Sequence, residues 1–158
     1  MLNWFIRRRL AAFEADFSHD ASYLHELLAM SRTAFWRFSR VQAMADYRDG
    51  VPLAAWYAAK ITAVRAEDCG PCTQLAVDMA RRAGVSDALL RAVLRDDLAA
   101  MGEEVSLAQR YARAAIAHDA ALPALRDEVR QRWGDKALAS LALTITATRP
   151  PRGYVSIA

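Results

Sequence analysis

The spacing of apolar residues is the feature that most constrains how this chain can fold. Apolar positions recur at intervals of three and four, and no segment shows the sustained alternation of a half-buried strand. The stretch 53–64 places Leu53, Trp56, Ile61 and Val64 on one helical face. Glycine and proline, which interrupt helices, number only 6 and 5. The sequence therefore predicts an all-α fold of about seven or eight helices.

Capping and breaking residues give the expected boundaries. Ser31 and Ser86 are suitable N-caps, and Gly134 ends one helix just before the next begins. The residue that precedes Pro150 disfavours helix, which ends the last one. The predicted helices span about residues 20–30, 31–45, 52–67, 69–84, 86–98, 106–118, 123–134 and 135–148.

The length of 158 residues fits one domain, and neither a repeat nor a low-complexity linker divides it. We expect N-terminal helices in 1–50, a central region in 51–100 and C-terminal helices in 101–158. Lys plus Arg is 21 and Asp plus Glu is 18, so the net charge is 21 − 18 = +3. Because the basic residues are dispersed among acidic neighbours, no phosphate-binding stripe for nucleic acid is predicted.

The N-terminus and the hydropathy pattern bear on membranes and localisation. No apolar run approaches the roughly 18–20 residues of a membrane span. Trp4 and Phe5 precede Arg7–Arg9, which is the reverse of the order in a secretory signal, so we expect a cytoplasmic protein. The three arginines are interpreted as a solvated face, with weak contact to a membrane surface as the less favoured alternative.

Cys69 and Cys72 are the only cysteines, and they open a predicted helix as Cys-Gly-Pro-Cys. Free N–H groups and the helix dipole at such a position stabilise a thiolate. Two intervening residues bring the sulfurs within disulfide reach across the first turn. The pair therefore predicts redox chemistry by thiol–disulfide exchange. The alternative is a pair of reduced cysteines that merely begins a helix.

Two other uses of paired cysteines fit the sequence less well. A structural zinc site needs four ligands, and the chain has two thiols with no histidines at a suitable downstream spacing, so no metal is expected. Thioredoxin shares Cys-Gly-Pro-Cys, but there the motif follows a strand, whereas an amphipathic helix precedes it here. No cofactor is expected either.

The helix–Cys-Gly-Pro-Cys–helix arrangement resembles the alkylhydroperoxidase D (AhpD)-like, carboxymuconolactone decarboxylase superfamily. The resemblance is clearest over residues 52–98, including the run Glu-Asp-Cys-Gly-Pro-Cys-Thr-Gln at 67–74 and Ala-Gly-Val-Ser-Asp at 83–87. It implies an all-helical protein that forms homo-oligomers. It also implies that Cys69 and Cys72 pass electrons and reduce peroxides, directly or through a partner protein.

The redox members of that family carry a proton relay. They have a glutamate twelve residues before the first cysteine and a histidine four residues after the second. This chain has Tyr57 and Ala76 at those positions. The resemblance therefore implies disulfide exchange with slow peroxide reduction, unless other residues supply the relay.

Four residues are candidates to replace the relay or to stabilise the thiolate. Lys60, on the helix before the cysteines, would favour a thiolate, although lysines commonly lay their stem on apolar surface. Glu67 and Asp68 abut the pair and either move protons or cap the helix. His118 is predicted on the apolar face of its helix, where it either serves the thiols or sits in the core.

The sequence thus favours a cytoplasmic, homo-oligomeric thiol–disulfide oxidoreductase that reduces a peroxide or a partner's disulfide. The alternative is a non-enzymatic helical oligomer that binds a small molecule or a protein.

Overall fold

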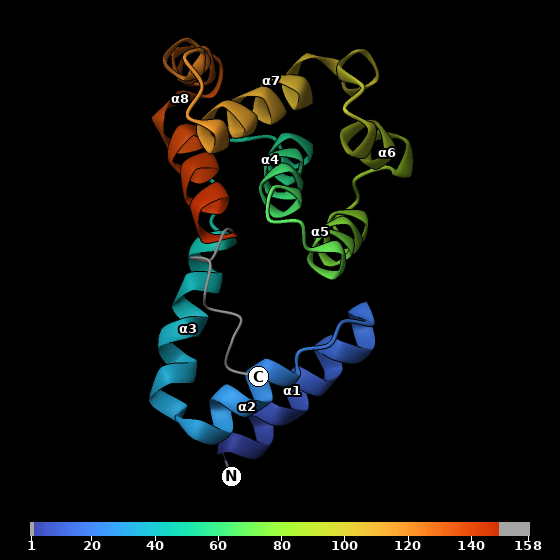
Figure 1. Cartoon of the computed structure of the whole chain (residues 1–158), viewed down its shortest axis with the longest axis vertical. Coiled ribbons are helices and arrows are strands. Elements are labelled where there is room, and N and C mark those ends of the chain that lie inside the picture. Colours follow the sequence, from blue (N-terminus) through green and yellow to red (C-terminus); the bar gives the residue numbers. More distant parts are fainter. Residues whose placement is uncertain (1, 149–158) are drawn as a thin grey trace.

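The computed structural model describes residues 2–148, with side chains from residue 3 onward, and all regular structure in that part is α-helical (Figure 1). The all-α prediction is confirmed for the described chain. None of its helices is both long and apolar enough to cross a bilayer. The elements are α1 (Leu2–Phe17), α2 (Ser22–Met30), α3 (Arg32–Ala45), α4 (Leu53–Arg65), α5 (Gly70–Arg82), α6 (Asp87–Arg95), α7 (Leu98–Ala117) and α8 (Leu122–Ala147).

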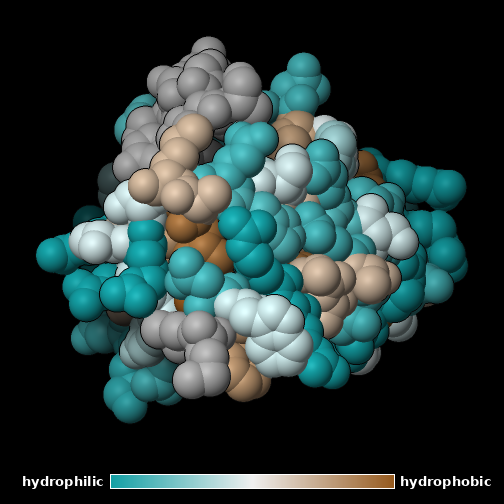
Figure 2. Space-filling model, turned by 90° about the horizontal axis from the view of Figure 1, so that it is seen from below, coloured by the Kyte–Doolittle hydropathy of each residue, from teal (hydrophilic) through white to brown (hydrophobic). Residues whose placement is uncertain are grey.

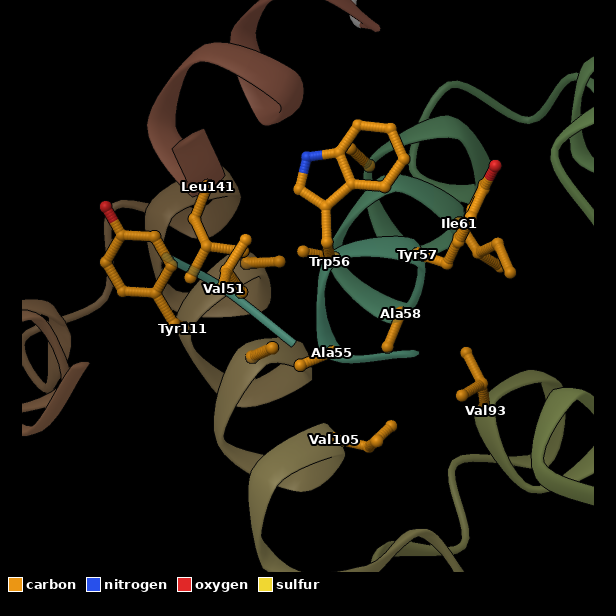
Figure 3. Close-up of a cluster of buried hydrophobic side chains, with 14 of the residues drawn as sticks. Val51, Ala55, Trp56, Tyr57, Ala58, Ile61, Val93, Val105, Tyr111 and Leu141 are labelled. Carbon is orange, nitrogen blue, oxygen red and sulfur yellow. The ribbon is translucent and has the colours of Figure 1, made fainter. Parts of the chain in front are cut away.

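Helix α4 forms the centre of the larger part of the molecule. Every residue from Ala55 to Val64 is buried, and α4 contacts α5, α6, α7 and α8. Figure 3 shows its side chains among Val93, Val105 and Leu141 of the surrounding helices. The sequence predicts a stripe on one face, but the helix is buried all round, as helices apolar on every side commonly are.

Helices α1, α2 and α3 lie at the other end of the molecule (Figure 1). They have a small apolar cluster of their own, in which Ile6, Leu28 and Phe35 are buried. The sequence analysis did not identify α1 as a helix. Its inward side chains at positions 6, 10, 13 and 17 do follow helical spacing, so the signal was present.

The predicted caps and breaks are confirmed in part. The hydroxyl of Ser31 accepts a hydrogen bond from the N–H of Ala34 at 3.2 Å, and Ser86 caps α6 in the same way. Gly134 has φ +84° and kinks α8, as its predicted breaker role requires. The start of α7 was predicted too late, at residue 106, because Asp97 caps the helix nine residues earlier by accepting from the N–H of Ala100.

Candidate functional site

The cysteine pair lies where α4 turns into α5. Asp68 adopts φ +53°, a left-handed conformation that redirects the chain between the two helices. Cys69 follows in an extended conformation as the N-cap of α5, and Pro71 occupies the first turn, where its missing N–H is not needed. Cys69 and Cys72 form a disulfide, with Cα atoms 5.3 Å apart. The predicted placement of the motif at a helix N-terminus is confirmed.

The two sulfurs have different surroundings. Cys69 is half-buried, and its Sγ accepts a hydrogen bond from the backbone N–H of Cys72 at 3.3 Å. Cys72 is exposed. Within the described chain, the Cys72 N–H is the single hydrogen-bond donor to either sulfur. The helix end therefore favours negative charge on Cys69, while Cys72 is the more exposed residue of the two.

Lys60 is not directed toward the cysteines. Its Nζ lies 2.7 Å from Oδ1 of Asp46, at the end of α3, and 4.6 Å from the ring centre of Trp56. Long side chains on a helix lean toward its N-terminus, and the cysteines follow the C-terminus of α4. The Lys60 side chain is 7% exposed, so the expectation of a lysine with its charged end in water is wrong. Lys60 instead joins α4 to the end of α3 through an ion pair with Asp46, whose side chain is 55% exposed.

Tyr57, at the position of the family's glutamate, belongs to the same group. Its ring contacts that of Trp56, with centroids 4.8 Å apart. Burial raises the pKa of the Tyr57 hydroxyl above 10.0, and the negative charge of Asp46 raises it further, against the opposing charge of Arg48. At neutral pH this hydroxyl is therefore protonated. It can donate a proton but cannot act as the base that a glutamate would be.

The raised pKa of Tyr57 leads to a testable pH dependence. The folded chain holds the Tyr57 proton more tightly than the unfolded chain does. The contribution of this proton to the free energy of unfolding is therefore complete below the ordinary tyrosine pKa. It is lost as pH rises through the higher folded pKa. We expect wild type to lose more unfolding free energy between neutral pH and pH about 11 than the Tyr57→Phe variant. Urea unfolding at both pH values measures this; equal losses would contradict it.

The remaining candidates are placed differently from the sequence expectations. The N-cap of α5 is Cys69 itself, so the interpretation of Glu67 or Asp68 as the cap is wrong. Both carboxylates nevertheless precede the disulfide directly. The predicted core position of His118 is also wrong: it is exposed, with φ +54°, and ends α7 as its C-cap. That end of α7 lies beside α8 in Figure 1, and α7 makes no close contact with α5 in the described chain.

The contacts of the basic side chain in the last turn of α4 were not predicted from the sequence. Arg65, in the last turn of α4, points its guanidinium to Asp96, with Nη1 3.2 Å from Oδ1. Gln109 donates to the same oxygen at 3.2 Å. Asp96 thus joins α4 to the α6–α7 junction through the Arg65 guanidinium. No sequence spacing connects positions 65, 96 and 109, which are joined only by the fold.

The described residues contain no group of three or more His, Cys, Asp or Glu side chains arranged to hold a metal ion. Two surface hollows lie away from the cysteines, one beside α7 and α8 and one on α3. Comparisons of the chain with models of protein families, with curated proteins and with solved structures found no match. Among the described residues, the cysteine pair is therefore the feature that points most directly to a chemical function.

Proposed function

We propose that the chain is a thiol–disulfide oxidoreductase that exchanges electrons between the Cys69–Cys72 pair and a dithiol or disulfide of a partner. The observation that supports this most strongly is the asymmetry of the pair. Cys69 caps a helix, and Cys72 is the more exposed of the two residues. An exchange reaction needs an accessible sulfur to attack and a second sulfur that leaves readily as a thiolate.

The steps follow from that asymmetry. A partner thiolate attacks Sγ of Cys72, the Cys69–Cys72 bond breaks, and Cys69 leaves as a thiolate that accepts from the Cys72 N–H. The partner's second thiolate then attacks the partner sulfur that is bonded to Sγ of Cys72, and Cys72 leaves as a thiolate. The partner loses two electrons and becomes a disulfide, and the pair gains them as a dithiol. In the opposite direction Cys72 attacks a partner disulfide and Cys69 resolves the adduct.

Peroxide is the second substrate class that the resemblance implies, and we expect it to react slowly. A thiolate would attack the O–O bond and become a sulfenic acid, and the other thiol would then displace water to close the disulfide. The alcohol or hydroxide that leaves needs a proton. Tyr57 lies with Trp56 and Asp46 at the other end of α4, and Ala76 cannot transfer protons. General acid–base assistance contributes about 10²–10⁴ in rate.

A paired kinetic assay tests the proposal. The oxidised chain is mixed with dithiothreitol, and the reduced chain is mixed in turn with glutathione disulfide, insulin and hydrogen peroxide. Alkylation of free thiols and mass spectrometry follow the Cys69–Cys72 bond. We expect exchange with both disulfides and a much slower reaction with peroxide. A pair that neither opens nor closes would instead support the non-enzymatic alternative.

Asp68 offers a separate test of the electrostatics around the pair. Asparagine tolerates the left-handed conformation found there, so Asp68→Asn removes the charge without straining the turn. Because a nearby carboxylate opposes a thiolate, we expect the variant, once its pair is reduced to the dithiol, to be alkylated by iodoacetamide a few times faster than reduced wild type near neutral pH. Glu26→Gln, a charge removed from α2, is the control. A slower reaction of Asp68→Asn would instead support the proton-transfer role.

We also propose that the protein works as a homo-oligomer. Exposed apolar side chains remain near the junction of α3 and α4, including Val41 at 38% and Tyr47 at 41% exposure. Sedimentation at micromolar concentration should show a dimer or a larger species. A single 17.5 kDa species at every concentration would contradict this proposal.

A further inference from the structure

The end of the molecule that is farthest from the α7–α8 end carries a surface that the redox proposal does not use. It is formed by the start of α1, the end of α2 and the first part of α3. The buried cluster of Ile6, Leu28 and Phe35 places these three segments together. We call it the tip surface and define it by its exposed residues: Trp4, Phe5, Arg7, Arg8, Arg9, Met30, Arg32, Trp36, Arg37 and Arg40.

The tip surface exposes more large apolar side chains than an ordinary solvated face. Met30 is 66% exposed, Phe5 58%, Trp4 56% and Trp36 49%. Figure 2 looks onto this end and shows hydrophobic side chains at the surface among strongly hydrophilic ones. Scattered apolar residues are normal on a protein, but a gathered set with a polar rim is typical of an interaction site.

The charge of the tip surface has one sign. Neither residues 2–10 nor α3 contains an acidic residue, and together they hold six arginines. None of the six guanidinium groups forms an ion pair with a carboxylate in the described chain, whereas most other arginines do. Arg32, Arg37 and Arg40 surround Trp36 in a shallow hollow, and Arg8 lies over the ring of Trp4 at 5.6 Å. The two arginine-containing segments are far apart in the sequence and both contact α2 in the fold, which is why the basic residues look dispersed along the chain.

We propose that the tip surface binds the anionic surface of a lipid bilayer. Arginines attract acidic headgroups, and tryptophan rings settle at the depth of the headgroups. Phe5 and Met30 have no polar group and fit the acyl boundary beneath them. The chain would then lie on a membrane, which agrees with the lack of a spanning helix among the described residues.

Two other occupants fit the surface less well. A symmetric dimer through this surface would place each set of six arginines against its copy, which like-charge repulsion opposes. Residues 149–158, which lie outside the described part, add two arginines and no acidic side chain, so their charge does not complement the surface either. Nucleic acid would also satisfy the arginines and could stack on the exposed rings, but it offers no apolar environment to the most exposed apolar side chain, Met30 at 66%, whereas a bilayer does.

Vesicle co-sedimentation of the full chain tests the proposal. We expect binding to vesicles of phosphatidylcholine with one third phosphatidylserine, no binding to pure phosphatidylcholine, and release at high salt. The double variant Arg32→Gln/Arg40→Gln should bind about 25-fold more weakly, because each arginine near an anionic surface contributes about fivefold. Trp36→Ser should also weaken binding and remove a fluorescence blue shift that vesicles induce in wild type.

The matched control is Arg91→Gln/Arg95→Gln, which removes the same charge from exposed positions on α6. It should bind vesicles as wild type does. Circular dichroism of each variant checks folding, and the salt and lipid dependence of wild type needs no variant at all. Three results would overturn the proposal: no binding to anionic vesicles, equal weakening by the control, or binding of a single-stranded oligonucleotide instead of vesicles. Loss of self-association in Trp36→Ser without any vesicle binding would likewise identify an interface between copies.

Discussion

Replacing Cys72 with serine should abolish thiol–disulfide exchange with a protein partner. The substitution removes the exposed sulfur, so no mixed disulfide can form there. Replacing Cys69 should have a different consequence, because Cys72 still attacks but no thiol remains to resolve the adduct. We therefore expect Cys69→Ser to accumulate a covalent adduct with a partner disulfide, which intact-mass spectrometry detects as the added mass of the partner.

A control variant on the same helix separates chemistry from folding. Gln74→Ala changes an exposed side chain on α5, two residues after Cys72, and leaves both sulfurs in place. It should exchange at the wild-type rate. Accumulation of the adduct in Cys72→Ser rather than in Cys69→Ser would reverse the roles that we assign to the two sulfurs. Exchange that persists in both serine variants would remove the pair from the reaction.

Leu141→Ala should lower the free energy of unfolding by about 2–5 kcal/mol, the range for deleting a buried leucine side chain. Leu141, on α8, has no exposed surface and belongs to the cluster around α4. The matched control is Leu98→Ala, since Leu98 is 43% exposed at the start of α7. That variant should lose only about 0.5 kcal/mol, as surface substitutions commonly do.

Urea denaturation followed by circular dichroism measures both variants under one condition. Because the disulfide affects the unfolded chain, the two variants are compared in the same oxidised state. A large loss in Leu98→Ala, or a negligible one in Leu141→Ala, would contradict the placement of the core around α4. Gradual unfolding with separate transitions would show that the α1–α3 cluster unfolds independently of it.

Much of the fold could be predicted from sequence because helices are specified locally. Ser31 and Ser86 cap helices where expected, and Gly134 interrupts α8. Prediction was wrong where tertiary packing decides the outcome. The all-round burial of α4 depends on four neighbouring helices, and periodicity within one segment cannot report how many neighbours it has. Helix α1 is a different case, because the helical spacing of its apolar residues is present in the sequence and could have predicted it.

The candidate site was also predictable only in part. The spacing of Cys69 and Cys72 and the proline between them identify the helix start directly. The partners of the pair were not predictable, because they depend on which way side chains point. Lys60 binds Asp46, and His118 takes a left-handed conformation that ends α7. The three- and four-residue spacing of apolar positions predicts neither a long-range ion pair nor the residue at which a helix ends.

A redox titration of the Cys69–Cys72 pair tests the central claim most directly. The chain is equilibrated in mixtures of reduced and oxidised dithiothreitol, free thiols are trapped by acid and alkylation, and the disulfide fraction is measured by mass spectrometry. We predict a reversible two-electron transition that is reached from both the oxidised and the reduced chain. A pair that remains entirely dithiol in every mixture, or a disulfide that no thiol reduces in the folded protein, would contradict the account.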